Sequence, residues 1–280
     1  MAWKNIKYEV KDNIGWITLN RPQKLNAFND ALLRELDEIL NQAEMDLEAK
    51  VLVFKGAGRA FSSGQDMSGI GTNEILHPDP WSRVTPKELL EGERRRQRRW
   101  EYIMNMAKPT IAQVHGYCLG AGLFLSMVCD ITIASEDAIF GDQVTRMGIL
   151  PTMPLWPWMV GMKKARELLF TGRNIPAKEA EAIGLVNKVV PASKLDEEVA
   201  RWAHGIAQHH GDALAFAKDA INGVMECRGV GAAFRITTDL QMAVLQRPTK
   251  SEDLAFYELR DKKGLKAALE ARDAPFKNFP

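Results

Sequence analysis

The sequence has few cysteines and no long apolar run. Its three cysteines, Cys118, Cys129 and Cys227, are too few and too scattered for a disulfide framework or a zinc site. No segment reaches the roughly 18 apolar residues of a membrane-spanning helix, and the N-terminus alternates like a strand, without the apolar stretch of a signal peptide. We therefore expect a protein of the reducing cytoplasm without a metal site.

An excess of either charge is also lacking. Lysine and arginine number 37 against 36 aspartate and glutamate residues, which leaves a formal net charge of +1. Nucleic-acid-binding proteins normally carry a basic surplus, so nucleic acid is not the expected partner. With 46% hydrophobic and 26% charged residues, the composition is that of a globular chain rather than a disordered one. The length suits one large α/β domain or two smaller ones.

The first half of the chain alternates between predicted strands and helices. Five short apolar or alternating runs have the length of strands: 8–10, 14–19, 51–54, 110–114 and 131–134. Asn29 or Asp30 is a potential cap for one helix, and the charged segment from Lys87 to Met106 predicts another after a mobile loop at 69–86. Helices dominate from Lys163 onward, so the order indicates an α/β core with a helical tail.

Two predicted strands lead into turns of small residues. One turn runs from Ala60 to Asp66 and the other from His115 to Gly122. Small residues let the backbone approach a ligand closely, and a helix that starts there leaves N–H groups free. Two such N–H groups that converge on one point make an oxyanion hole, although each turn alone is also typical of simple packing. Neither turn matches the dinucleotide fingerprint or the phosphate loop.

In combination, the segments resemble the crotonase (enoyl-CoA hydratase/isomerase) superfamily over essentially the whole chain. The matching segments, in the family's order, are Leu19–Pro22, Leu25–Ala27, Ala60–Asp66, Lys108–Ala112, Gly116–Gly122, Cys129–Asp130, Ala138–Gly141, Phe170–Gly172, Gly184–Asn187 and Arg272–Lys277. The resemblance implies an α/β spiral of ββα turns over residues 1–200 and a C-terminal helical region over 201–280 that forms trimers, often paired into hexamers. It also implies a coenzyme A thioester as the substrate, with no separate cofactor.

The same resemblance implies where the thioester is held. The oxyanion donors would be the N–H of Gln65, within the Gly-x-Asp motif, and the N–H of Ala121, in the middle of the Gly-Gly-Gly element. Lys24 and the end of the strand at Ala60 and Phe61 match segments beside the nucleotide part of coenzyme A. Lys277 would reach the same part from a neighbouring subunit.

The two catalytic glutamates of the family's hydratases are absent. Phe124 stands at the first position, Val144 at the second, and Thr152 where other branches carry an aspartate. Hydration normally needs one carboxylate to order water and one to deliver a proton, so short-chain crotonyl-CoA should be a poor substrate. Asp142 is either a catalytic carboxylate or the cap of a helix that begins near Val144. His115 is either an acid/base group or a buried structural histidine.

Bulky side chains and one arginine run complete the set of candidates. Phe124 and Trp156 either belong to the core or shape a roomy pocket for a bulky or cyclic acyl group. The arginines from Arg94 to Arg99 predict a helix face directed to solvent or to ligand phosphates. We expect an acyl-CoA enzyme for hydration, isomerisation, carbon–carbon cleavage or thioester hydrolysis. The alternative is a non-catalytic protein of the same fold that binds acyl-CoA or RNA.

Overall fold

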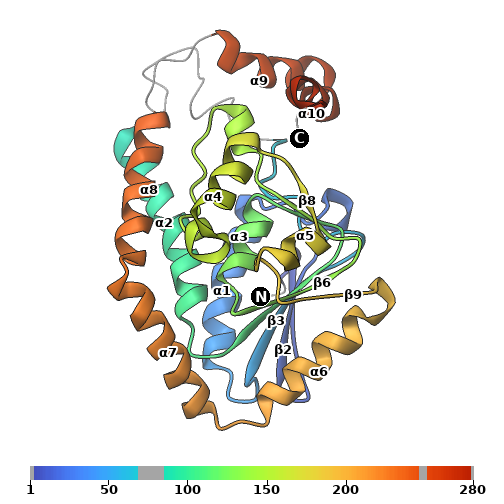
Figure 1. Cartoon of the computed structure of the whole chain (residues 1–280), viewed down its shortest axis with the longest axis vertical. Coiled ribbons are helices and arrows are strands. Elements are labelled where there is room, and N and C mark those ends of the chain that lie inside the picture. Colours follow the sequence, from blue (N-terminus) through green and yellow to red (C-terminus); the bar gives the residue numbers. More distant parts are fainter. Residues whose placement is uncertain (1–2, 69–84, 246–250, 279–280) are drawn as a thin grey trace.

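A computed structural model describes residues 3–68, 85–245 and 251–278 of the chain. Within these residues a main sheet has the strand order β1-β2-β3-β4-β6-β9 (Figure 1). The strands are β1 (Ile6–Lys11), β2 (Ile14–Leu19), β3 (Val51–Gly56), β4 (Thr110–Val114), β6 (Ile131–Ser135) and β9 (Lys188–Val190). β1 and β2 form an antiparallel hairpin, and every further neighbouring pair is parallel. The five predicted strands and the α/β class are confirmed.

Two helices with predicted positions, the one after Asn29 and the one over 87–106, are present close to those positions. The α-helices of the described residues are α1 (Asp30–Met45), α2 (Pro86–Asn105), α3 (Ala121–Val128), α4 (Trp156–Thr171), α5 (Ala177–Ala182), α6 (Leu195–Ala207), α7 (Gly211–Cys227), α8 (Val230–Leu245), α9 (Ser251–Lys263) and α10 (Leu265–Asp273). Asn29 caps α1 by accepting a hydrogen bond from the N–H of Leu32 at 2.9 Å. A capping box between Thr85 and Glu88 starts α2. Most of the expected mobile loop at 69–86 lies outside the described residues.

Helices cover both faces of the main sheet, so its central strands are buried on both sides. In β3, Leu52 and Phe54 pack with α1, α2 and α3, whereas Val51 and Val53 pack with α6. Figure 1 shows α6 on the opposite side of the sheet from α1. A strand that is apolar on both faces reads as a continuous hydrophobic run, which is why this strand was predictable from its sequence.

A second, smaller sheet places the ends of two chain segments next to each other. It has the order β5-β7-β8, with β5 at Tyr117–Leu119, β7 at Ile139–Gly141 and β8 at Ile175–Pro176. Along the chain, β4 and β5 are followed by α3. In the same way β6 and β7 are followed by α4, with a short 3-10 helix, η3 (Val144–Met147), between β7 and α4. This repeat is the expected spiral of ββα turns. Because Leu119 pairs with Gly141, the start of α3 lies beside the segment that follows β7.

The C-terminal helices extend beyond the sheet. The expected division between residues 200 and 201 falls inside α6, which packs on the sheet through Val199 and Ala203. The first helix after this packing on the sheet is α7, and α8 still contributes Val230 and Phe234 to the buried core. In Figure 1, α7 and α8 run past α2, and α9 and α10 lie at one end of the molecule. α10 contacts η3. No helix in the described part of the chain is both long and apolar enough to cross a membrane.

Candidate active site

The two small-residue turns predicted from the sequence lie directly against each other. The Ser62 N–H donates to the Tyr117 carbonyl at 2.9 Å, and the Leu119 N–H donates to the Ser62 carbonyl at 3.0 Å. Gly64 has a φ of +92°, and a Cβ atom there would lie 2.7 Å from the Leu119 carbonyl oxygen. Only glycine combines that backbone conformation with so close a contact. The glycine therefore sets how near the Gln65 backbone comes to the start of α3.

Two backbone N–H groups at this contact, those of Gln65 and Ala121, have no hydrogen-bond acceptor among the described residues. The Phe28 N–H donates to the Gly64 carbonyl and the Asp66 N–H donates to the Phe28 carbonyl, each at 2.8 Å. Since N–H groups alternate in direction along an extended chain, the Gln65 N–H points away from Phe28. Ala121 is the first residue of α3, where N–H groups have no partner within the helix. Neither N–H donates to another described residue, and both residues line one cavity.

An ion pair holds the turn that carries Gln65. Arg21 Nη2 lies 2.9 Å from Asp66 Oδ2, and the Ser68 N–H donates to Asp66 Oδ1 at 3.1 Å. Burial alone would raise the pKa of Asp66, but the Ser68 hydrogen bonds and the Arg21 guanidinium bring it below its ordinary value. Asp66 is therefore a charged, fully engaged side chain that positions the turn.

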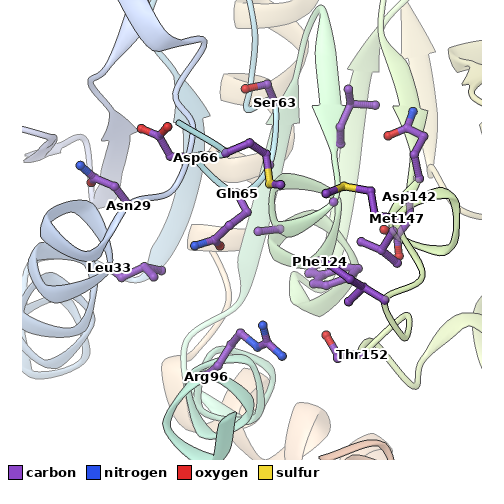
Figure 2. A pocket seen from close by; sticks show the side chains of 18 of the residues that line it. Asn29, Leu33, Ser63, Gln65, Asp66, Arg96, Phe124, Asp142, Met147 and Thr152 are labelled. Carbon is purple, nitrogen blue, oxygen red and sulfur yellow. The ribbon is translucent and has the colours of Figure 1, made fainter. Parts of the chain in front are cut away.

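The cavity between these turns, α1, α2 and the segment after β7 has a volume of about 630 Å³, within the range of small-molecule sites. Figure 2 shows side chains from all these segments pointing into it. It collects most of the residues singled out from the sequence: Lys24, Gln65, Ala121, Phe124, Asp142, Val144 and Thr152. Phe124 packs edge-on against Trp100, with ring centroids 6.4 Å apart, so its ring forms part of an apolar wall.

Asp142 is a buried carboxylate that borders the cavity. It follows β7 directly, its side chain is 3% exposed, and neither carboxylate oxygen has a hydrogen-bond partner among the described residues. The residue at the cap of η3 is Gln143, with no side-chain capping bond, so Asp142 is not itself the N-cap residue of that helix. Burial raises its pKa to about 7, and the nearby Val144 amide offsets only part of that effect. A carboxyl group with such a pKa is suited to proton transfer near neutral pH.

Replacing Asp142 with asparagine should stabilise the protein at alkaline pH. The unfolded carboxyl ionises near its ordinary pKa of 3.8, whereas the folded one ionises near 7. Between these values the folded chain binds more protons, so wild-type stability falls as pH rises. Because an amide has no charge to bury, the variant should gain about 3 kcal/mol relative to wild type as the pH rises from 5 to 8. Urea unfolding at both pH values measures this gain, and a difference that does not change with pH would contradict it.

Several candidates predicted from the sequence do not reach the cavity. His115 Nε2 lies 2.9 Å from the Gly58 carbonyl oxygen and outside the residues that line the cavity. A structural role fits this position, although the side chain is half-buried rather than buried as the second interpretation had it. Ala60 and Phe61 are buried within the turn and do not line the cavity. Trp156 is also buried and lies behind Asp142, where both border a small hollow. Lys277 is exposed, and its contribution to a neighbouring subunit stays a prediction.

The arginine run on α2 is only partly a solvated face. Arg94, Arg95 and Arg98 are exposed as predicted. Arg99, however, is buried and binds Asp37 through two hydrogen bonds of 2.5 and 2.7 Å. Arg96 pairs with a glutamate one turn earlier and lines the cavity. Arg96 lies one helical turn before the buried Trp100, and that spacing is the sequence signal that places it on the inner face.

Comparison with known proteins agrees with this architecture. A family model described as enoyl-CoA hydratase/isomerase matches residues 9–278. A relative named "Probable enoyl-CoA hydratase" from Rhizobium meliloti is 37% identical over 81% of this chain and 84% of its own length. The crystal structure of an enoyl-CoA hydratase/isomerase from Xanthobacter autotrophicus is 33% identical, with a TM-score of 0.84 over the whole of both chains. That of a Mycobacterium smegmatis enoyl-CoA hydratase is 30% identical, with a TM-score of 0.86 over 97% of this chain and 94% of its own. The chain therefore belongs to the enoyl-CoA hydratase/isomerase (crotonase) family.

Proposed function

We propose that this protein is an acyl-CoA thioester enzyme whose reaction resembles that of an enoyl-CoA hydratase. The observation that carries the proposal is one cavity that holds two unused backbone N–H groups, at Gln65 and Ala121, and a buried carboxylate without a partner, at Asp142. The names of the relatives support the same class of activity. An ionisable group that is buried without a partner costs stability. A use of that group in proton transfer accounts for this cost, whereas a non-catalytic binding protein has no need of it, so an enzyme is favoured.

The two N–H groups would hold the thioester carbonyl oxygen. Hydrogen bonds from Gln65 and Ala121 strengthen as negative charge develops on that oxygen, which stabilises an enolate or a tetrahedral intermediate. Asp142, which lines the same cavity, would then move a proton to or from the acyl group. In a hydration, its carboxylate takes a proton from the attacking water and returns it to the α-carbon. One carboxylate would thus perform both steps for which the hydratases use two.

The mouth of the cavity suits the charged part of coenzyme A. Lys24 is exposed at the rim, in the short 3-10 helix η1 (Pro22–Lys24). A lysine is a point charge suited to phosphate oxygens. Ala60 and Phe61 would support this rim from below rather than contact the nucleotide, since both are buried.

Exposed apolar side chains on the C-terminal helices support a homotrimer or a pair of trimers. Among the large apolar side chains that are more than half exposed in the described residues, five belong to the C-terminal helices: Phe216, Ile221, Val224, Ile236 and Leu240. They lie on α7 and α8. Apolar surface of this kind is typical of a subunit interface.

A direct assay separates the enzyme from the non-catalytic alternative. The protein is incubated with crotonyl-CoA, cinnamoyl-CoA and a cycloalkenyl-CoA, and the products are identified by mass spectrometry and chromatography. We expect a bulky thioester to gain one water, to isomerise or to release coenzyme A. Crotonyl-CoA should react at least about 10²-fold more slowly than with a two-carboxylate hydratase, because a general acid/base group is missing. Binding of all three thioesters without conversion of any would favour the non-catalytic protein.

A further inference from the structure

A group of polar side chains lies at the end of the cavity formed by α2 and α8. Glu93 and Arg96 come from α2 and Gln241 from α8, and all three line the cavity. The walls around them are apolar, with Leu89 one turn before Glu93 and Trp100 one turn after Arg96. The proposed function assigns no role to this polar group. Polar side chains in an apolar wall need partners, and those found among the described residues leave some of their atoms unpaired.

Arg96 keeps part of its hydrogen-bonding capacity unused. Its Nη2 atom donates to Glu93, but its Nε atom is buried without a partner among the described residues. The side chain is 32% exposed, against 13% for Glu93. Figure 2 shows Arg96 pointing from α2 into the space where Gln65, Phe124 and Thr152 are also drawn. Its guanidinium therefore presents donors to whatever occupies that space.

Gln241 is similarly incomplete. The side chain is 3% exposed, and its Oε1 atom is buried with no hydrogen-bond partner among the described residues. A buried amide oxygen without a hydrogen-bond partner is costly. The two ends of such an amide are interchangeable by rotation, so Gln241 can present either its carbonyl or its N–H₂ group to a ligand.

We propose that the acyl group carries an oxygen atom remote from the thioester, and that Arg96 and Gln241 bind this oxygen. The proposal rests on the proposed function and names its substrate class. Glu93 already balances the charge of Arg96, so an uncharged carbonyl or hydroxyl oxygen suits the site better than a second carboxylate. The substrate would thus be an oxo- or hydroxyacyl thioester rather than a plain hydrocarbon chain.

Three saturated thioesters of nearly equal shape test the proposal by calorimetry: hexanoyl-CoA, 5-oxohexanoyl-CoA and glutaryl-CoA. All three carry three methylene groups after the thioester carbonyl and differ at C5, which is a methylene in hexanoyl-CoA, a ketone in 5-oxohexanoyl-CoA and a carboxylate in glutaryl-CoA. We expect 5-oxohexanoyl-CoA to bind about tenfold more tightly than hexanoyl-CoA, as a charge-assisted hydrogen bond that a matched apolar ligand cannot make would predict. Arg96→Met should abolish this advantage. Arg95→Met, on the exposed face of the same helix, should retain it.

A second variant guards against a purely structural effect. Since Arg96→Met leaves Glu93 without its ion-pair partner, the double variant Glu93→Gln/Arg96→Met keeps the charge balanced and should also lose the advantage. Equal binding of 5-oxohexanoyl-CoA and hexanoyl-CoA by the wild-type protein would overturn the proposal. An advantage of 5-oxohexanoyl-CoA that survives in both Arg96→Met and the double variant would also overturn it. Tightest binding of glutaryl-CoA, lost in Arg96→Met, would uphold the oxygen site and overturn its preference for an uncharged group. Failure of all three thioesters to bind would instead contradict the proposed function.

Discussion

Asp142→Asn is expected to lower the turnover of a converted enoyl-CoA thioester by about 10²- to 10⁴-fold, the usual contribution of a positioned general acid or base. The amide matches the carboxylate in shape but cannot exchange a proton. Binding of the thioester should stay within a few-fold of wild type, because Gln65 and Ala121 still hold the carbonyl oxygen. The measurement is kcat and KM for the best substrate found in the product assay.

The pH profile of the same variant carries further information. If the Asp142 carboxylate takes a proton from water, wild-type kcat should rise with pH through about 7, where the carboxyl ionises. The residual kcat of the variant should lack this step. Asp137→Asn is a matched control, since Asp137 is exposed and five residues earlier in the chain. Turnover of Asp142→Asn within threefold of wild type would assign proton transfer to another group.

Gly64→Ala should also reduce turnover strongly, through the backbone rather than a side chain. The added Cβ would lie 2.7 Å from the Leu119 carbonyl oxygen, in a conformation with a φ of +92°. The turn must shift to accommodate it, which moves the Gln65 N–H away from the oxyanion position. Loss of one such donor typically costs about 10²–10³ in kcat. The strained backbone should also lower the stability of the fold by about 1–3 kcal/mol.

Two further variants separate the catalytic effect from a general loss of structure. Gly92→Ala, on an open face of α2 with nothing within 4 Å, should leave kcat unchanged. Gly120→Ala also strains the backbone, at a φ of +46°, but its Cβ meets only the Gly64 Cα at 3.8 Å, so it should reduce kcat less than Gly64→Ala does. Wild-type kcat in a folded Gly64→Ala protein would show that this turn does not hold the reacting oxygen.

Features set by local sequence were predictable. The strands at 51–54 and 110–114 are apolar throughout because both faces of the sheet are covered. The cap of α1 at Asn29 follows from the preference of that position for a side-chain acceptor. The turn at Gly64 was visible as a cluster of small residues. In each case the signal can be read within a few consecutive residues.

Features that depend on distant neighbours were not predictable in the same way. The sequence left Asp142 open as a cap or a catalytic group, and its burial is decided by the side chains packed around it. His115 was a candidate until its bond to a carbonyl 57 positions away placed it outside the cavity. Arg99 reads as part of a solvated run, but its partner Asp37 lies 62 positions away.

The sequence by itself determined the α/β class, the order of the strands and helices, and the two turns that carry Gln65 and Ala121. Local conformational preferences and hydrophobic periodicity are written in consecutive residues. Only the tertiary structure decided that Asp142 is buried without a partner and that Arg96 lines the cavity. The energy of an ionisable side chain depends on how much water its surroundings exclude and on which charges they bring near, and chain segments far apart in the sequence supply both.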